Sequence, residues 1–99
     1  EDLGFCEKGE AAQYIKDTPL TWNGGSLAHN TTGGQLSSGQ AGAAGGFMGL
    51  VEAIRQLSDA GLNNAVTDVN IALVSGYGMV IYDRCLSSNA AILCRGENG

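Results

Sequence analysis

The feature that most constrains this chain is a glycine-rich stretch that runs directly into a helix-like pattern. Seven of the 16 glycines lie between residues 33 and 49. Glycine has no Cβ atom, so the backbone there can approach a ligand or another element closely. A helix that begins behind such a loop also presents unpaired N–H groups at its N-terminus. The pattern therefore predicts a site built largely from backbone atoms.

Residues 41–58 have the apolar period of an amphipathic helix. The apolar side chains at this spacing, which we expect to face the core, are Phe47, Leu50, Val51, Ile54 and Leu57. The polar side chains expected on the opposite face are Glu52, Arg55 and Gln56. A glycine inside a helix costs about 1 kcal/mol relative to alanine, so glycines 42, 45, 46 and 49 predict close packing against another element. Gly61 is expected to end the helix.

The C-terminal third has the composition of strands. Residues 69–74 are nearly all apolar, and such strands are usually covered on both faces. We expect residues 75–78 to break this strand, residues 79–82 and 90–94 to form further strand, and residues 83–89 to form a polar loop. The order of helix, strand and strand predicts one layer of an α/β sandwich, with the helix packed on a sheet that includes residues 69–74.

The N-terminal third is less regular. A short helix is expected near residues 7–15, ended before Pro19. Residues 18–26 are rich in turn formers and predict a loop. Residues 27–32 are expected to lead into the glycine-rich loop as a short extended piece.

Composition narrows the function classes. The chain has 99 residues, a net charge of −5 and no basic stripe, so nucleic acid is not an expected partner. No apolar run reaches the roughly 20 residues of a membrane span. The three cysteines, Cys6, Cys85 and Cys94, lack the paired spacing of zinc ligands. His29 could serve as a fourth ligand, but the spacing does not support a zinc site. We therefore expect no metal, and free thiols in a reducing cytoplasm.

Familiar catalytic motifs are absent around the glycines. No Gly-Lys-Ser/Thr follows them, as a phosphate-binding P-loop requires, and no clear strand precedes them, as a dinucleotide-binding fingerprint requires. Ser75 lacks the preceding glycine of a nucleophile elbow. The spacing of Cys85 and His29 gives no support to a Cys–His pair.

Several motifs in order resemble the C-terminal half of a thiolase. They are Asn-Thr-Thr-Gly-Gly at residues 30–34, Gly-Gln-Ala-Gly at 39–42 and the helix pattern at 49–57. Residues 5–10 resemble the segment upstream of the Asn-x-x-Gly-Gly motif, and residues 71–78 resemble the penultimate strand with its Cys-x-Gly turn. The likeness is nearest to the sterol-carrier and lipid-transfer branch, and it covers nearly the whole chain.

The resemblance implies a fold. Two similar α/β halves form a five-layer structure in thiolases, with the nucleophilic cysteine in the N-terminal half. The chain, which opens at Glu1 without an initiator methionine, is then the C-terminal part of a thiolase-type layered α/β sandwich, incomplete on its own. Residues 1–99 form a partial domain, with a lead-in segment at 1–26 and the loop, helix and strands at 27–99. We expect it to associate with the rest of its chain or with another copy, as a dimer.

The resemblance also implies a site, from which the sequence departs twice. Gln40 stands where the family has its histidine base, and Val74 stands where it has the cysteine of Cys-x-Gly. A glutamine amide still donates hydrogen bonds, so Gln40 can serve an oxyanion hole, the alternative being a loop-capping amide. Valine has no proton to move, so the usual acid–base function is lost at this position.

Other residues are candidates for the site. Tyr77 and His29 are possible replacement acid–base groups, the alternatives being a packed strand-end tyrosine and a scaffold histidine. The residues that we expect to bind the substrate are Asn30, Gly33, Gly34, Gly39 and Gly76.

The resemblance implies an acyl-CoA enzyme of lipid metabolism that acts on a carbon–carbon bond. A coenzyme A thioester is then the substrate, with no covalently bound cofactor. Acyl transfer is the family's usual reaction. One alternative is a retro-aldolase that shortens acyl-CoA side chains and works with an OB-fold acyl-CoA-binding partner. Another is a non-catalytic subunit that binds acyl-CoA or serves as a scaffold.

Overall fold

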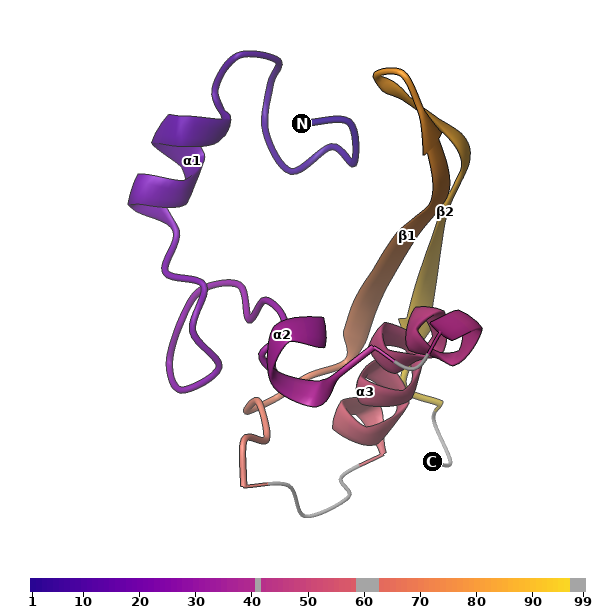
Figure 1. Ribbon diagram of the computed structural model, residues 1–99. Helices are drawn as coiled ribbons and strands as arrows, with labels where there is room; N and C mark the ends of the chain where they lie inside the picture. Colours follow the sequence, from indigo (N-terminus) through magenta and orange to yellow (C-terminus); the bar gives the residue numbers. More distant parts are fainter. Residues whose placement is uncertain (41, 59–62, 97–99) are drawn as a thin grey trace.

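The computed structural model describes residues 1–40, 42–58 and 63–96. In chain order, the elements are helices α1 (Ala11–Asp17) and α2 (Gln35–Ser38), the 3-10 helix η1 (Gly42–Phe47), helix α3 (Met48–Leu57), and strands β1 (Ile71–Ile81) and β2 (Arg84–Cys94). The most extensive contacts between elements join β1 to β2 and α3 to β1. Figure 1 shows α3 beside the lower part of the two strands, with α1 on the opposite side of the picture.

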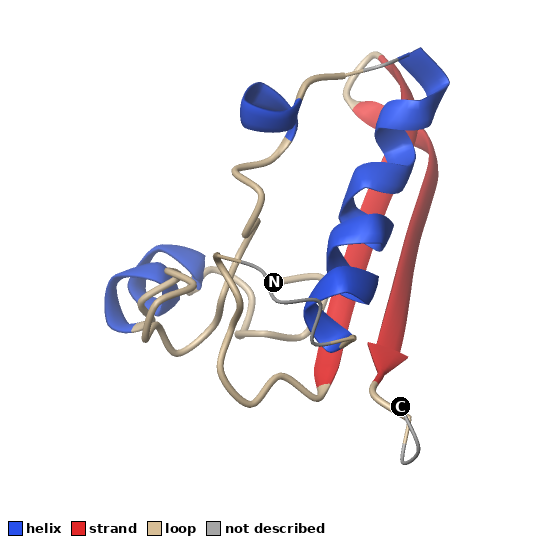
Figure 2. Ribbon diagram, turned by 90° about the horizontal axis from the view of Figure 1, so that it is seen from below, coloured by secondary structure: helices blue, strands red, loops and turns tan. Residues whose placement is uncertain are grey.

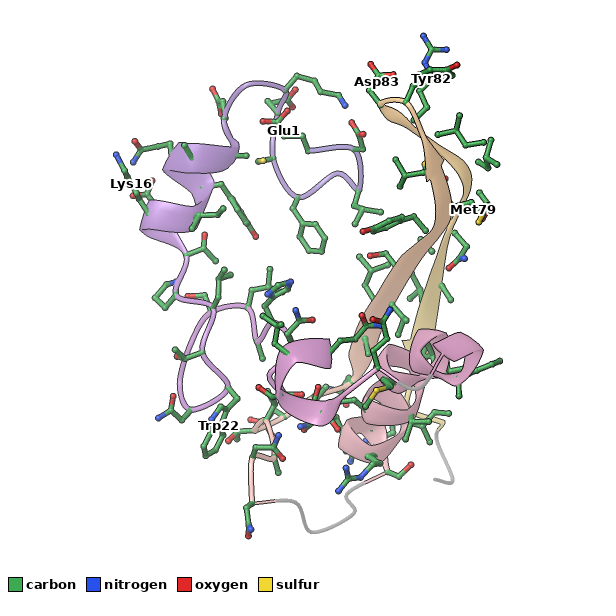
Figure 3. All side chains as sticks on the ribbon, in the orientation of Figure 1. Glu1, Lys16, Trp22, Met79, Tyr82 and Asp83 are labelled. Carbon is green, nitrogen blue, oxygen red and sulfur yellow. The ribbon has the colours of Figure 1, made fainter. Side chains whose placement is uncertain are left out.

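The two strands form one long antiparallel hairpin. Pairing runs from Ile71 opposite Cys94 to Ile81 opposite Arg84. The connection is a two-residue turn in which Tyr82 has a positive φ of 58°, as the hairpin turns that match strand twist require. In Figure 3, the side chains of Tyr82 and Asp83 project from the tip of the hairpin.

The predicted break in β1 and the predicted loop at residues 83–89 are both wrong. Gly76 lies opposite Asn89 and Gly78 opposite Ser87, so the pairing continues through the glycines. Every residue of β2 except Leu93 is exposed. Serine and asparagine are therefore compatible with this strand, because their side chains stay in water. Sequence polarity indicated a loop where the structure has a solvated strand.

Helix α3 packs on one face of the hairpin, as predicted. A Cβ atom built on Gly49 would lie 3.4 Å from Val74 Cγ1, so the glycine brings helix and strand close together. Ala72 and Val74 on this face are half-buried, whereas Ile71 and Leu73 on the other face are exposed. Figure 2 shows α3 running along one side of the two strands. The expectation that both faces of this strand are covered is therefore wrong for the described residues.

The predicted orientation of α3 is also wrong. Phe47, Val51 and Ile54, expected in the core, are 64%, 52% and 48% exposed. The buried side chains of the helix are Glu52, Ala53, Gln56 and Leu57. With Gly49 they form one helical face, on which small residues allow close approach and hydrogen bonds satisfy the polar ones. Among these, only the burial of Leu57 was predicted correctly.

The N-terminal segment contains a helix later than expected. Helix α1 begins at Ala11, whose N–H donates to Glu1 Oε1 at 3.2 Å, and it ends before Thr18 and Pro19. The backbone N–H groups of Gly9 and Ala11 hold the pKa of the Glu1 carboxyl below its usual range. Figure 3 shows the Lys16 side chain on the outer side of α1.

The segment between α1 and α2 is a loop. The predicted loop at residues 18–26 is confirmed, with Gly25 N–H donating to the Thr21 carbonyl at 3.2 Å. No strand forms over residues 27–32, because only isolated backbone bonds tie them to the loop: Leu27 N–H donates to Pro19 and His29 N–H to Leu20. The predicted helix end at Gly61 lies outside the described residues.

Replacing Gly49 with valine tests the close packing of α3 on β1. A Cβ atom at this position already reaches van der Waals contact with Val74 Cγ1, so the two further carbons of valine are expected to crowd this contact, and overpacking typically costs about 1–3 kcal/mol. Gly46→Val is the matched control, because no atom lies within 4 Å of a Cβ atom at Gly46. We expect urea unfolding to give a lower free energy of unfolding for Gly49→Val than for Gly46→Val. Equal values would contradict the packing.

The exposed apolar stripe of α3 (Phe47, Val51 and Ile54) predicts association. No described helix is long and apolar enough to cross a membrane. Contiguous apolar surface on a soluble domain usually marks a contact. We expect another copy, or the rest of a longer protein, to cover the stripe. Sedimentation of the 99-residue chain at micromolar concentration checks this, and a stable monomer with a cooperative thermal transition would contradict it.

Candidate functional site

The glycine-rich loop begins with a tight turn. Gly33 N–H donates to the Asn30 carbonyl at 2.8 Å, and Asn30 has a positive φ of 48°. Gly34, with a φ of 74°, precedes α2 directly, and Thr32 Oγ1 accepts its N–H at 3.3 Å. Gly39 ends α2 with a φ of 97° and donates its N–H to the Gln35 carbonyl at 2.8 Å. Glycine at 34 and 39 is thus required by backbone conformation.

A polar network attaches this turn to α3. Thr31 Oγ1 donates to Glu52 Oε1 at 2.7 Å. Gln56 Nε2 donates to Glu52 Oε1 at 3.1 Å, to Thr31 Oγ1 at 3.3 Å and to the Asn64 carbonyl at 3.0 Å. Asn64 Nδ2 donates in turn to the Thr31 carbonyl at 2.5 Å. Gln56 Oε1 accepts the N–H of Val66 at 2.9 Å, so both ends of its amide are used.

The network contains one nearly buried carboxylate, that of Glu52. Its side chain is about 10% exposed, and its second oxygen lies 3.6 Å from Arg55 Nη1, which reaches it from the surface. A buried carboxylate is unfavourable unless it is paired and hydrogen-bonded. Here the threonine hydroxyl, the glutamine amide and the arginine provide those partners. The loop and the helix are therefore held together by one shared carboxylate.

A hollow of about 370 Å³ opens between the loop and the N-terminal half of α3. Thr32 and Ser38 line it from the loop side. The residues that line it from the helical side are Ala44, Phe47, Met48, Val51, Glu52 and Arg55. The exposed apolar stripe of α3 thus forms part of its wall. None of the site residues predicted from the sequence lines this hollow.

The predicted site residues fall into two groups. Asn30, Gly33 and Gly34 share one turn, where Asn30 Nδ2 lies 3.6 Å from the Cβ position of Gly34. Gly39 and Gln40 follow after α2. The Gln40 side chain is exposed, and its Cγ lies 3.2 Å from the Cβ position of Gly45. His29 is exposed beside the turn.

The second group lies on the hairpin. Gly76 pairs with Asn89, and Tyr77 pairs with Ser88 and is 74% exposed. Tyr77 alternates with Val74 along β1, so it lies on the face away from α3. Among the described residues, no hydrogen bond or ring contact joins the Tyr77 side chain to Gln40 or His29.

No metal centre is formed by the described residues. No group of three or more histidine, cysteine, aspartate or glutamate side chains is placed there to hold a metal ion. Cys6, Cys85 and Cys94 are free cysteines.

Sequence reasoning missed the network altogether. Glu52 and Gln56 were assigned to solvent because they are polar. The available signal was their spacing: they are four residues apart and lie on the same face as Gly49 and Ala53. A helix face with small residues and paired polar residues approaches a partner more closely than one with bulky apolar side chains.

Comparison with known proteins decides the family. Residues 1–93 match the family described as thiolase C-terminal domain-like. The chain belongs to this thiolase family. The match confirms the resemblance found in the sequence motifs, and the described helix and hairpin are consistent with a part of such a domain.

Three relatives illustrate the range of this thiolase family. The 17-hydroxy-3-oxo-4-pregnene-20-carboxyl-CoA lyase of Mycobacterium tuberculosis and the steroid side-chain-cleaving aldolase of Thermomonospora curvata are each 37% identical to the chain over 79 residues, 80% of this chain and 19% of the relative. An acetyl-CoA acetyltransferase of Methanocaldococcus jannaschii is 33% identical over 82 residues, 82% of this chain and 20% of the relative. The chain therefore spans about one fifth of the length of these relatives. No solved structure matches it significantly.

Replacing Gln56 with leucine tests the network in this thiolase domain. The change removes one of the donors to the Glu52 carboxylate and the Gln56 partners of the Asn64 carbonyl and the Val66 N–H, and unsatisfied buried groups cost about 1–3 kcal/mol each. Gln13→Leu on α1 is the matched control, because Gln13 bonds only the exposed Asp17. We expect Gln56→Leu to lower the midpoint of urea unfolding well below that of Gln13→Leu. Equal midpoints would mean that the network contributes little to stability.

Proposed function

We propose that the protein to which this domain belongs cleaves a carbon–carbon bond of a coenzyme A thioester by a retro-aldol reaction. The observation that carries the proposal is the role of Val74. Its Cγ1 packs within 3.4 Å of the Cβ position of Gly49, at the place where the thiolase resemblance puts a proton-moving cysteine. A packed hydrocarbon cannot exchange a proton, so the usual thiolase acid–base step has no donor there. The names of two relatives, a CoA-thioester lyase and a side-chain-cleaving aldolase, support the same reading.

The proposed reaction needs no oxidant. A base takes the proton from a hydroxyl on the β-carbon of the thioester, and that carbon becomes a carbonyl as the bond between the α- and β-carbons breaks. The electron pair remains on the α-carbon as a thioester enolate. Protonation of this carbon gives a shorter acyl-CoA. The substrate class is therefore an acyl-CoA with a hydroxyl group on its β-carbon.

Candidate roles follow from the chemistry of the side chains. The Gln40 amide donates a hydrogen bond to the enolate oxygen, as oxyanion holes do. Tyr77 is the proposed acid–base group, because its phenol is exposed on the face of β1 that α3 leaves open. His29 is the second candidate for that role. Asn30, Gly33, Gly34, Gly39 and Gly76 are proposed contacts with the thioester. The proposed enzyme is cytoplasmic, forms a dimer and works with an OB-fold acyl-CoA-binding partner.

A second candidate function is acyl transfer. It is favoured by the similarity to the acetyl-CoA acetyltransferase. It requires a nucleophilic cysteine in the part of the protein beyond this chain. A non-catalytic acyl-CoA-binding subunit is the third candidate.

A substrate comparison separates the three functions. The full-length protein is incubated either with a β-hydroxyacyl-CoA or with a β-ketoacyl-CoA plus free CoA, and the products are identified by mass spectrometry. We expect a carbonyl compound and a shorter acyl-CoA from the first substrate, and no thiolysis of the second. Thiolysis alone would replace the proposal with acyl transfer, and binding without either reaction would indicate the non-catalytic subunit.

Variants of the full-length enzyme assign the residues. Gln40→Ala is expected to lower kcat about a hundred- to a thousand-fold with little change in KM, since an oxyanion donor acts mainly in the transition state. Tyr77→Phe should also lower kcat, whereas Tyr82→Phe, at the 98% exposed hairpin tip, should not. Gln40→His restores the family base, but Val74 still lacks a proton, so thiolase activity should not return. Unchanged kinetics in Gln40→Ala would remove Gln40 from the site.

A further inference from the structure

Helix α3 buries polar residues and exposes apolar ones, which is the reverse of what packing of an apolar face requires. Its apolar stripe of Phe47, Val51 and Ile54 remains at the surface, while Glu52 and Gln56 are each only 8% exposed. Glu52 is ion-paired with Arg55, and replacing a buried ion pair by apolar residues of similar size is often neutral or stabilising, so the burial of Glu52 is weak evidence for a stability role. The alternative role of such buried polar groups is to fix one geometry.

The geometry that the pair fixes is that of Thr31. The Thr31 hydroxyl donates to Glu52 Oε1 and accepts from Gln56 Nε2, and the Thr31 carbonyl accepts from Asn64. Hydrogen bonds thus hold both the side-chain hydroxyl and the main-chain carbonyl of Thr31. Thr31 lies inside the turn closed by the bond from Gly33 N–H to the Asn30 carbonyl. A residue held from two sides cannot shift without moving that turn.

The same pair sets the spacing between loop and helix. Thr32 and Glu52 line the hollow from opposite sides. Thr31, which precedes Thr32 in the chain, is tied to Glu52 by the hydrogen bond of 2.7 Å. Lengthening this bond would widen the hollow and move Gly33 and Gly34 with the turn.

We propose that Glu52 and Gln56 are positioning residues that hold the turn at residues 30–34 in its acyl-CoA-binding place through Thr31. This role rests on the proposed function, because it is in that function that the turn binds the thioester. Neither side chain touches the substrate. They act through one hydroxyl group, so the effect of their loss should appear in thioester binding before it appears in the chemical step.

The test uses the full-length protein with Thr31→Val, which removes the hydroxyl at nearly constant shape, and Thr31→Ser, which keeps it. Thr67→Val is the matched control, since Thr67 is exposed. Binding of acetyl-CoA is measured by titration calorimetry, kcat and KM by the cleavage assay, and folding by circular dichroism and thermal unfolding. We expect Thr31→Val to weaken acetyl-CoA binding and raise KM by about tenfold, which corresponds to loss of about 1.4 kcal/mol, with a smaller change in kcat. Thr31→Ser should bind within about threefold of the unchanged protein.

Each outcome either supports or overturns the positioning role of Glu52 and Gln56. A folded Thr31→Val that binds acetyl-CoA as tightly as the unchanged protein would overturn the positioning role, whether or not its thermal stability is lowered. Where Thr31→Val does not fold, Glu52→Gln takes its place, with Glu7→Gln on the exposed N-terminal segment as control, and unchanged binding in Glu52→Gln overturns the role. Binding that is weakened in Thr31→Val but restored in Thr31→Ser, in a protein that cleaves neither test substrate, would retain the positioning role and reject the retro-aldol function alone.

Discussion

The arrangement of this domain depends on one buried carboxylate and its partners. Glu52 receives hydrogen bonds from the Thr31 hydroxyl and the Gln56 amide, and Gln56 also holds the Asn64 carbonyl and the Val66 N–H. Two separate segments therefore meet at α3: the turn before α2 and the stretch that leads to β1. Hydrogen bonds between charged and neutral groups are individually worth about 1.5–3 kcal/mol, and loss of one partner leaves the others unsatisfied. The network is thus cooperative and specific to one loop position.

A second constraint is the closeness of α3 to the hairpin. Ala53 is buried beside Glu52, and Gly49 leaves little space between the helix and Val74, so the helix axis can approach β1 while the polar side chains reach the loop. Bulky residues on that face would push the helix away and break the bonds to Thr31. The small residues and the polar network are therefore parts of one arrangement, and the apolar stripe on the outer face is left for another contact.

The sequence predicted element types better than faces and boundaries. The period at residues 41–58 predicted α3, and the run at 69–74 predicted β1, because both signals come from local spacing. The orientation of α3 was missed, since hydrophobicity alone does not tell which face of the helix packs on the hairpin. The continuation of β1 through Gly76 and Gly78 was missed because pairing with β2 outweighs weak local propensity. The glycine-rich loop was predicted from its composition, but the turn at residues 30–34 was not, because the position of Thr31 depends on Asn64, which is distant along the chain.

That distance has a kinetic consequence. The bond from Asn64 to the Thr31 carbonyl joins residues 33 positions apart, and the bond from Thr31 to Glu52 joins residues 21 apart. Ordering a loop of this length carries an entropy cost that local helix and hairpin formation does not. The hairpin and α3 can therefore form first, and the turn reaches its final position only when both long-range bonds close. We therefore expect the region proposed to bind the thioester to become ordered after the hairpin and α3, and to open before they do.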